Sequence, residues 1–501
     1  MTLLQLLDGI PVTQLLQMAY GKMAQTEDIT VGKITYDSRT VERGDLFVAI
    51  RGLKLDGHRF IEEAVNKGAH TVVLEDDRTI PDSFFIHNDV IKVLVEDSRR
   101  ALAQLAANYY GHPSRKLRLI GVTGTNGKTT TTHLLKSILE AADEKVGLIG
   151  TIEYKIGEEV IPAVHTTPES LELNTLLDRM VNNSCRSAVM EVSSHALALE
   201  RVYGLDFRLA LFTNLTQDHL DLHGTMEAYF KAKKMLFDGL NERSIAVTNL
   251  DDDRGLSIIA STKAKRVTYG IERQGDVGVE NVKTGMDGIS FHVKYDNRAM
   301  TVSSPLTGRF NLYNLLGATT SALALGVEPE EIQEGIENVK SVRGRFEQIP
   351  SAKGWMVIID YAHTPDALKK TLEAIREMLR KDKPGKVITI FGCGGERDRE
   401  KRPLMGRIAS ELSDVTIVTS DNPRNEDPDR IINEILQGVQ NDAEVKRIVD
   451  RREAIHAGLD LAERGDVVLI AGKGHETYQV LGDKRIHFDD REVVEAYLKS
   501  L

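Results

Sequence analysis

Residues 121–129 carry the residue types and spacing that point most directly to chemistry, reading Gly-Val-Thr-Gly-Thr-Asn-Gly-Lys-Thr. Glycines let backbone N–H groups close around phosphate oxygens, Lys128 can reach the β- and γ-phosphates, and the Thr129 hydroxyl can bind Mg²⁺. The strict P-loop pattern has Gly where this chain has Val122, so the loop is a variant. The alternative is a glycine-rich turn with an exposed lysine. We predict an ATP site formed by Thr123, Gly124, Thr125, Asn126, Gly127, Lys128 and Thr129.

Candidate metal ligands follow two later apolar runs. Glu191 ends one run, and ligands bind at the carboxyl ends of parallel strands, where a carboxylate can hold Mg²⁺ directly or through water. The alternative is a strand-end acid that faces solvent. His219 and His223 have a spacing that zinc sites use. We discount zinc because no supporting helix is evident and no glutamate lies between the two histidines.

Two further stretches remain ambiguous from the residues alone. Lys231, Lys233 and Lys234 lie in a helical pattern over residues 226–237 and look like a solvated face, and nothing in the periodicity distinguishes Lys233. The tetrapeptide Asp-Asn-Pro-Arg at 421–424 follows a predicted strand. By itself it is typical of a turn with a capping Asp and a helix-stopping Pro.

Strands and helices must alternate along the chain to position these residues. Apolar runs at 117–122, 188–192, 209–213 and 245–248 alternate with helical patterns, one of which starts near residue 128. Such alternation favours a parallel sheet covered by helices on both faces. The chain before it carries β-like runs at 46–50 and 71–74, a helical pattern at 60–67 that ends at Gly68, and a predicted linker at 111–114.

The last part of the chain repeats the alternation from about residue 342. Its pattern predicts a second doubly wound sheet. The fold class is therefore α/β, with three domains. The predicted order is strand 356–359, helix 366–379, strand 387–391, helix, strand 415–418, two helices and strand 467–470.

Composition bounds the possible functions. The chain has 501 residues, which suggests about three domains, and its net charge of −11 argues against a broad basic surface for nucleic acid. Two cysteines, Cys185 and Cys393, form neither a disulfide framework nor a zinc pattern. The first basic residue is Lys22 and no apolar run approaches about 18 residues, so we expect a cytoplasmic protein without signal peptide or membrane insertion. We also expect a monomer.

Six motifs in a fixed order make the pattern specific. The set resembles the Mur ligase family, which adds amino acids to the peptide stem of the cell-wall precursor, and it spans nearly the whole chain. Within the family the chain is similar to the ligases that extend UDP-N-acetylmuramoyl-L-alanyl-D-glutamate (UDP-MurNAc-L-Ala-D-Glu) by a third residue. The motifs are Gly-Thr-Asn-Gly-Lys-Thr at 124–129, Glu-Val-Ser-Ser-His at 191–195, Asn-Leu-Thr-Gln-Asp-His-Leu-Asp at 214–221, Gly-Arg-Phe-Asn-Leu-Tyr-Asn at 308–314, Arg-Gly-Arg-Phe-Glu at 343–347 and Asp-Tyr-Ala-His-Thr-Pro-Asp at 360–366.

The resemblance implies three domains: residues 1–112 for the UDP-muramoyl substrate, 113–341 for ATP and 342–501 for the incoming amino acid. It implies catalytic roles for Lys128, His219 and Lys233, with Lys233 carbamylated by CO₂. The carbamate, Thr129, Glu191 and His219 would bind two Mg²⁺ ions. Further residues match substrate contacts: Ser38, Thr166, Thr167, Ser193 and Arg201 for the UDP-linked dipeptide, and Asn311, Asn314, Arg345 and Asp360 for ATP.

The resemblance also implies which amine is added. Members that add meso-diaminopimelate have Arg where this chain has Arg424, and lysine-adding members usually do not. Diaminopimelate differs from lysine by a second carboxylate, which a planar guanidinium can bind bidentately. The alternative is the same chemistry with L-lysine. The residues that match diaminopimelate contacts are Arg397, Asp421, Asn422, Pro423, Arg424, Gly472 and Glu476.

The implied reaction activates the γ-carboxylate of D-Glu as an acyl phosphate, which the amine then attacks. Two other classes compete with it. A folylpolyglutamate-type ligase shares the last two domains, but such relatives start near the phosphate loop, whereas about 110 residues precede the loop here. A P-loop ATPase that drives a partner protein would hydrolyse ATP without either small substrate.

Overall fold

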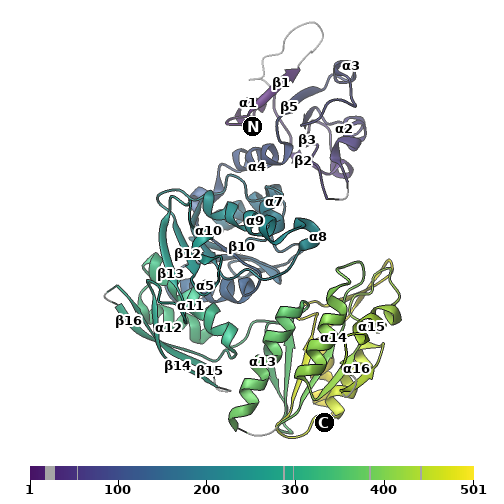
Figure 1. Cartoon of the computed structure of the whole chain (residues 1–501). Helices are drawn as coiled ribbons and strands as arrows, with labels where there is room; N and C mark the ends of the chain where they lie inside the picture. The colour runs from purple at the N-terminus through teal and green to yellow at the C-terminus, as the bar shows by residue number, and fades with distance from the viewer. Residues whose placement is uncertain (17–28, 54, 286–287, 297, 383–384, 441–442) are drawn as a thin grey trace.

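Three α/β domains follow one another in the computed structural model (Figure 1). The structure describes residues 1–16, 29–53, 55–285, 288–296, 298–382, 385–440 and 443–501. The predicted fold class is confirmed, because each domain is built on its own largely parallel sheet. The boundaries at residues 112 and 341 stay predictions.

The N-terminal domain has a five-stranded sheet in the order β1-β5-β4-β3-β2, in which β1 alone runs antiparallel to its neighbour. Gly68 follows the helix predicted at 60–67 and has φ +110°, as a helix-ending glycine requires. The predicted linker at 111–114 is more ordered than expected, because buried Pro113 begins a 3-10 turn. The elements are β1 (Val12–Leu16), β2 (Ile34–Thr35), β3 (Leu46–Val48), α2 (Ile61–Asn66), β4 (Thr71–Leu74), α3 (Asp82–His87), β5 (Ile91–Val95) and α4 (Ser98–Tyr109).

The central domain has an eight-stranded sheet in the order β13-β12-β11-β6-β10-β7-β8-β9. Its middle strands are buried on both faces, with α5 and α11 on one side and α6 and α9 on the other, which explains their continuous apolar runs. The elements are β6 (Arg118–Thr123), α5 (Lys128–Ala141), β7 (Val146–Ile149), β8 (Glu153–Ile156), β9 (Glu159–Pro162), α6 (Ser170–Asn182), β10 (Ser187–Glu191), α7 (Ser194–Ala198), β11 (Phe207–Phe212), α8 (Leu220–His223), α9 (Met226–Asp238), β12 (Ile245–Asn249) and β13 (Lys265–Tyr269).

A small antiparallel sheet, absent from the sequence prediction, follows the central sheet. Its strands are β14 (Gly278–Gly285), β15 (Gly288–Tyr295) and β16 (Arg298–Ser304). Phe291 and other alternate residues of β15 pack into the core beneath α12 (Pro329–Asn338), next to α11 (Arg309–Leu325). This sheet therefore covers one side of the central domain.

The C-terminal domain has a six-stranded sheet in the order β17-β18-β22-β19-β20-β21, in which only β17 is antiparallel. The four predicted strands are present, and β21 lies between the two helices that were predicted to be consecutive. The elements are β17 (Glu347–Pro350), β18 (Met356–Asp360), α13 (Pro365–Asp382), β19 (Val387–Phe391), α14 (Lys401–Leu412), β20 (Val415–Val418), α15 (Pro428–Leu436), β21 (Glu444–Arg447), α16 (Arg451–Asp460), β22 (Val467–Ala471), the hairpin β23 (Tyr478–Leu481) and β24 (Lys484–His487), and α17 (Asp490–Lys499).

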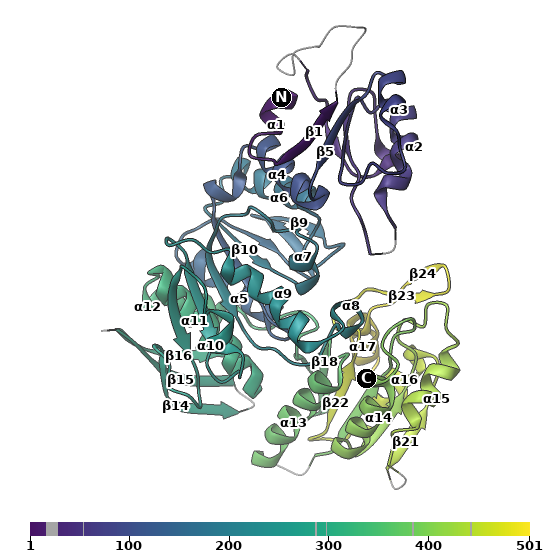
Figure 2. The same ribbon diagram turned by 45° about the horizontal axis from the view of Figure 1, so that its top comes forward.

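The three domains are arranged so that α8 lies on the side of the central domain that faces the C-terminal domain (Figures 1 and 2).

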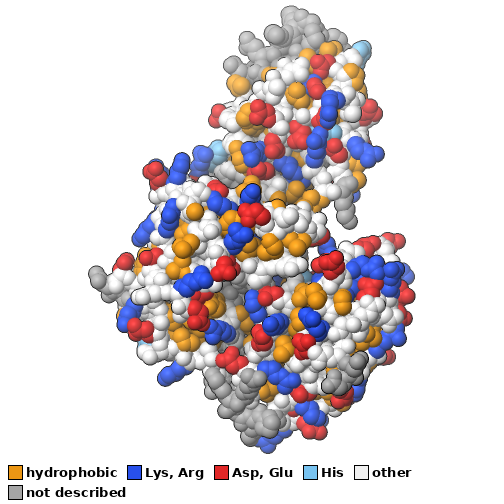
Figure 3. All heavy atoms as spheres, in the orientation of Figure 1, with side chains coloured by type: hydrophobic (Ala, Val, Ile, Leu, Met, Phe, Trp, Pro, Cys, Tyr) orange, Lys and Arg blue, Asp and Glu red, His pale blue; other side chains and the backbone are white. Residues whose placement is uncertain are grey.

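Basic and acidic side chains are interspersed over the face of the molecule shown in Figure 3. Within the described ranges, no helix is both long and apolar enough to cross a membrane.

Candidate functional site

The predicted phosphate loop is a tight turn between β6 and α5. Gly127 has φ +87°, and a Cβ there would lie 2.3 Å from Oδ1 of Asn314. Gly124 is equally constrained, because a Cβ there would lie 1.9 Å from Oγ1 of Thr213. The backbone N–H of Thr125 donates to the carbonyl of Asn214 at 2.8 Å. Glycine is therefore required at both positions by backbone conformation and by close packing.

Lys128 folds back over this loop. Its Nζ donates to the carbonyl oxygens of Gly124 at 2.9 Å and Thr125 at 2.8 Å. Burial lowers the pKa of the Lys128 ammonium. A nucleotide phosphate would offer the ammonium a stronger, charge-assisted partner than these carbonyls. Lys128 is thus held at the loop in a position from which it can turn to a phosphate.

Of the two asparagines of α11 predicted to bind ATP, Asn314 lies against Gly127 of this loop, and Asn311 contacts Asn314. The Nδ2 of Asn314 donates to Oδ1 of Asn311 at 3.0 Å, and Nδ2 of Asn311 donates to the carbonyl of Thr307 at 2.8 Å. Both side chains are buried. Thr123 Oγ1, at the end of β6, is buried without a hydrogen-bond partner in the described part of the chain.

Glu191 lies at the end of β10 with its side chain fully buried, so it does not face solvent. Its Oε1 accepts from the Thr151 backbone N–H at 2.8 Å and its Oε2 from the Thr151 hydroxyl at 2.9 Å. These bonds hold both carboxylate oxygens of Glu191 in place, and carboxylate oxygens are ligands that suit Mg²⁺. Glu191 and the buried Thr129 hydroxyl are hard oxygen donors: Glu191 ends β10, and Thr129 lies in the first turn of α5, after the neighbouring strand β6.

His219 has a left-handed backbone, with φ +53°, directly before the short helix α8. Its ring lies edge-on to the ring of His195, with centroids 4.7 Å apart. Burial lowers the pKa of His219 to about 4, so the imidazole is neutral near pH 7 and able to bind a metal. No cluster of three or more His, Cys, Asp or Glu side chains forms a metal cage among the described residues. Mg²⁺ commonly keeps waters and phosphate oxygens, so it needs no such cage.

Lys233 is buried, which corrects the prediction of a solvated lysine face on α9. Its side chain is about 1% exposed, whereas Lys231 is exposed. The Nζ donates to the Gly124 carbonyl at 2.8 Å and lies 4.5 Å from the centroid of the Tyr229 ring. Burial, and then the nearby charge of Lys128, hold the pKa of Lys233 well below its ordinary value. A buried amine with a lowered pKa therefore lies against the phosphate loop.

The residues predicted for the UDP-linked dipeptide fall into two places. The Thr167 hydroxyl donates to the Glu191 carbonyl at 2.8 Å and accepts from the Ser193 N–H at 3.1 Å. Thr166 Oγ1 lies 3.1 Å from Thr151 Oγ1, and Arg201 Nη1 donates to the Thr167 carbonyl at 2.9 Å. Ser38 lies apart in the N-terminal domain, where its hydroxyl donates to Glu63 at 3.0 Å.

Arg345 and Asp360 bring the C-terminal domain to the phosphate loop. The Nη2 of Arg345 donates to the Thr129 hydroxyl at 3.1 Å, and the guanidinium lies over the Tyr361 ring. Asp360, at the end of β18, accepts from the Phe346 N–H at 2.7 Å and so orients the loop that carries Arg345. Burial raises the pKa of the Asp360 carboxyl.

The residues predicted for diaminopimelate gather at the carboxyl ends of β19, β20 and β22. The Nδ2 of Asn422 donates to Oε2 of Glu476 at 2.8 Å. Gly472 has φ +111°, and a Cβ there would lie 2.7 Å from Oδ2 of Asp421. Asp421, Asn422 and Pro423 are buried. One edge of one sheet therefore holds the whole set.

The two arginines of this set flank one glycine. A Cβ on Gly394 would lie 3.0 Å from Nη1 of Arg424 and 3.7 Å from Cγ of Arg397. Arg424 has φ +54°, and its Nη1 donates to the Gly395 carbonyl at 2.6 Å. Arg397 is exposed. Nη1 of Arg424 and the side-chain stem of Arg397 therefore lie next to each other at Gly394.

Four residues that the sequence analysis did not single out take part in these contacts. Thr151 donates to Glu191, and Asp366 accepts from Asn126 Nδ2 at 3.2 Å across the domain boundary. Buried Lys473 donates to Glu476 at 3.2 Å, and Glu169 accepts from Arg201 Nε at 2.6 Å. Asp366 ends the quoted motif at 360–366, and Lys473 lies between the predicted site residues Gly472 and Glu476, so both positions carry a signal that could have found them.

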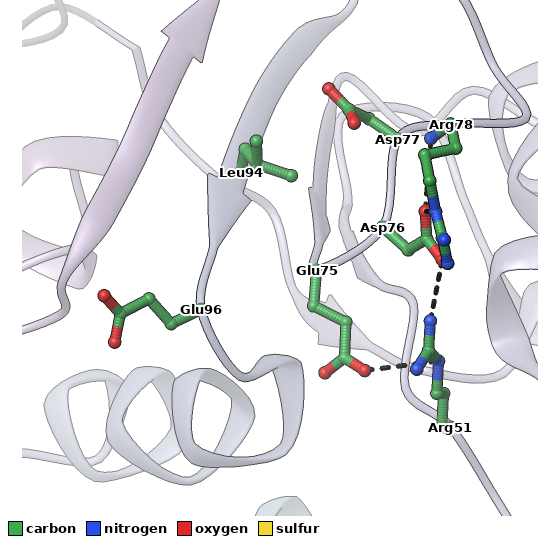
Figure 4. Close-up of a pocket in the computed structure, with 7 residues that line it drawn as sticks. All are labelled: Arg51, Glu75, Asp76, Asp77, Arg78, Leu94 and Glu96. Carbon is green, nitrogen blue, oxygen red and sulfur yellow. Dashed lines mark hydrogen bonds and ion pairs between the residues drawn. The ribbon is translucent and has the colours of Figure 1, made fainter.

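A separate hollow of about 350 Å³ lies on the N-terminal domain (Figure 4). Arg51 pairs there with Asp76 at 2.7 Å and with Glu75 at 3.3 Å. None of its lining residues is a predicted site residue, so we do not include it in the site. The lining residues are Arg51, Glu75, Asp76, Asp77, Arg78, Leu94 and Glu96.

The chain is similar to known proteins over nearly its whole length. Three family models match: "Mur ligase family, catalytic domain" at residues 30–110, "Mur ligase middle domain" at 122–322 and "Mur ligase, glutamate ligase domain" at 344–474. A relative from Clostridium botulinum, named UDP-N-acetylmuramoyl-L-alanyl-D-glutamate--2,6-diaminopimelate ligase, is 45% identical over 94% of this chain and 96% of its own. A relative of the same name from Caldanaerobacter subterraneus subsp. tengcongensis is 46% identical over 94% of this chain and 95% of its own.

A solved structure with that ligase name aligns with a TM-score of 0.67 and 32% identity, covering 95% of this chain and 96% of its own. The match therefore extends through all three domains, including the N-terminal one that precedes the phosphate loop. The chain belongs to the Mur ligase family.

Proposed function

We propose that this enzyme is an ATP-dependent ligase. It joins meso-diaminopimelate to the D-Glu γ-carboxylate of UDP-MurNAc-L-Ala-D-Glu, in the synthesis of the peptidoglycan precursor. Near-full-length relatives with the matching ligase name support the assignment. The observation that carries it is the hydrogen bond from Arg345 to Thr129, because it joins the amine-side domain to the phosphate loop.

The first step forms a bond between a γ-carboxylate oxygen and the γ-phosphorus of ATP, and ADP leaves. Two anions must approach, so cationic groups at the loop lower the barrier. Lys128 is such a group once its ammonium turns from the Gly124 and Thr125 carbonyls to the phosphates. In the second step the amine nitrogen attacks the acyl carbon, phosphate leaves and the nitrogen loses a proton.

The donors present suit Mg²⁺. Thr129 and Glu191 offer buried oxygens, and His219 offers a neutral imidazole. Lys233 as its carbamate would complete the set for two ions, and burial lowers the pKa of its amine, which favours the unprotonated form that adds CO₂. When bound, Mg²⁺ offsets the negative charge that meets at the phosphoryl group.

The residues that select the amine lie at one edge of the C-terminal sheet. Glu476, as a carboxylate, suits an ammonium group, and Arg424 with Arg397 suits the additional carboxylate of diaminopimelate. Lysine would leave that arginine pair without its anion, which penalises the wrong substrate. Lysine stays the runner-up amine. A folylpolyglutamate-type activity is disfavoured by the N-terminal family match over residues 30–110.

Product mass tests the proposal directly. The purified enzyme is incubated with ATP, Mg²⁺, UDP-MurNAc-L-Ala-D-Glu and equal amounts of L-lysine and meso-diaminopimelate. We expect the diaminopimelate product together with ADP and phosphate. Equal amounts of the lysine product would remove the role of Arg424, and steady phosphate release from ATP and Mg²⁺ alone would favour a partner-driving ATPase.

A further inference from the structure

Glu169 lies where the N-terminal domain meets the substrate side of the central domain. It occupies the position before α6, and its carboxylate is about 12% exposed. Oε1 accepts from Nε of Arg201 at 2.6 Å, and Oε1 and Oε2 accept from Nη1 of Arg99 at 3.3 and 3.2 Å. Two guanidinium groups from different domains therefore share one carboxylate.

Arg99 reaches this carboxylate from α4 of the N-terminal domain. Its Nε donates to the Arg51 carbonyl at 2.7 Å within that domain. Its Nη1 also donates to the Leu199 carbonyl at 3.2 Å in the central domain. The Arg99 side chain is about 13% exposed. Arg99 thus ties both domains to Glu169 in a place where solvent screens the charges weakly.

Arg201 continues the contacts toward the phosphate side. Its Nη1 donates to the Thr167 carbonyl, and the Thr167 hydroxyl donates to the Glu191 carbonyl. A continuous set of hydrogen bonds therefore runs from Arg51 through Arg99, Glu169, Arg201 and Thr167 to Glu191.

We propose that Glu169 is a positioning residue for the UDP-linked substrate. It holds Arg201 in the orientation that binds the dipeptide and keeps that arginine in register with the N-terminal domain. The inference rests on the proposed function, because it takes Arg201 as a substrate contact. A substrate that spans two domains gains affinity when both halves of its site are held at the correct separation.

The test uses the full-length variants E169Q and E169D. Titration calorimetry gives the Kd of UDP-MurNAc-L-Ala-D-Glu, and steady-state assays give KM for each substrate. We expect E169Q to raise the Kd and KM of the UDP-linked substrate about tenfold, while KM for ATP changes less than about twofold. E169D keeps a carboxylate and recovers part of the loss.

Glu200 offers a matched control. It pairs with Arg100 at 2.8 Å, so it also joins α4 to the central domain, but through the neighbouring arginine. We expect E200Q to leave every KM within about twofold of wild type. A merely structural role for Glu169 would instead lower the thermal midpoint and raise all three KM values together.

Two results would overturn the inference. Wild-type affinity for the UDP-linked substrate in folded E169Q, or a parallel rise of all three KM values, removes the positioning role and leaves the proposed function intact. Failure of the wild-type protein to bind UDP-MurNAc-L-Ala-D-Glu removes both proposals together.

Discussion

Lys233 is the residue whose environment departs furthest from that of an ordinary lysine. Its amine is buried, contacts the Gly124 carbonyl and has a strongly lowered pKa. We predict that K233A loses at least about 99% of activity and that short carboxylates such as acetate restore part of it, since they can replace a carbamate. Phosphate release with all substrates present measures both effects.

Lys231 provides the control for this prediction. It lies on the same helix α9 but is exposed, so K231A should keep nearly full activity and show no response to acetate. Wild-type turnover by K233A would contradict the carbamate.

Arg424 decides the preference for diaminopimelate if its guanidinium meets the additional carboxylate. We predict that R424A raises KM for diaminopimelate by about 10- to 100-fold while KM for ATP changes little, because a lost charge-assisted pair costs about 1.5–3 kcal/mol. R430A is the control, since Arg430 is exposed on α15 and pairs with Glu434 there. An unchanged diaminopimelate KM in R424A would show that Arg424 has no such role.

Single residues were predictable from the sequence where motif and local position agreed. Glu191 was placed at a strand end, and it ends β10. The burial of Lys233 could not be read from a helix that carries three lysines close together, because exposure depends on how α9 packs against the phosphate loop. Glu169 was missed because its partners Arg99 and Arg201 are distant in sequence.

At the scale of elements, Arg402 of α14 joins two acidic partners near the amine site. It is fully buried and pairs with Glu426 at 2.9 Å and Glu434 at 2.7 Å. Glu426 lies two residues after Arg424, and Glu434 lies on α15. Removing one partner of a buried pair leaves an uncompensated charge. These pairs therefore hold α14, α15 and the 421–424 turn together.

The ion pair between Arg402 and Glu426 predicts how the stability of the C-terminal domain depends on pH. Hydrogen bonding to Arg402 lowers the pKa of Glu426 to about 2, below the ordinary value of about 4.3. Its contribution to stability is therefore complete above about pH 4.3 and is lost as the pH falls toward 2. We expect E426Q to be less stable than wild type by about 1–2 kcal/mol at pH 7, with the difference shrinking below pH 4.3. Thermal midpoints across this pH range measure it.

Glu411, exposed on the same helix α14, gives the comparison. E411Q should change stability by less than about 0.5 kcal/mol at any of these pH values. A difference between E426Q and wild type that stays constant down to pH 2 would show that Glu426 does not titrate in this way.

Elements were predictable where apolar runs are continuous and buried on both faces. The strands that became β6, β10, β11 and β12 were all anticipated within a few residues. The sheet β14–β16 was not, because its strands are amphipathic and partly exposed and derive their stability from packing on α12. The edge strand β21 was also missed, because its residues are exposed or half-buried and do not form a continuous apolar run.

At the scale of the whole molecule, a hydrogen bond joins the C-terminal domain to the predicted ATP site in the central domain. Arg345 from the C-terminal domain donates to Thr129 of the central domain. We predict that R345A raises KM for ATP about tenfold and lowers kcat, while KM for UDP-MurNAc-L-Ala-D-Glu stays within about twofold. Steady-state kinetics with each substrate varied in turn measure the three values.

Arg343 lies two residues away and pairs with Asp489 inside the C-terminal domain, so R343A is the control. It should leave KM for ATP near the wild-type value. An unchanged KM for ATP in R345A would place the contact outside the nucleotide site.

The three-domain organisation was predictable because length and motif order constrain it, and membership in the family is confirmed. The contacts between domains were not predictable. Asn126 and Asp366 are far apart in sequence, and only their positions in the folded chain bring them within 3.2 Å.

The residues predicted to bind diaminopimelate lie in one part of the sequence, and this has a consequence for how their specificity could be exchanged between genes. Arg397, Asp421–Arg424 and Gly472–Glu476 all come from loops at one edge of one sheet in the last third of the chain. Under the proposed function, a single genetic crossover upstream of β17 would therefore transfer the complete set between lineages and leave the residues proposed to activate the carboxylate unchanged. Under the proposed function, exchange of that one segment would change which amine is added, provided that the incoming segment keeps an arginine able to reach Thr129.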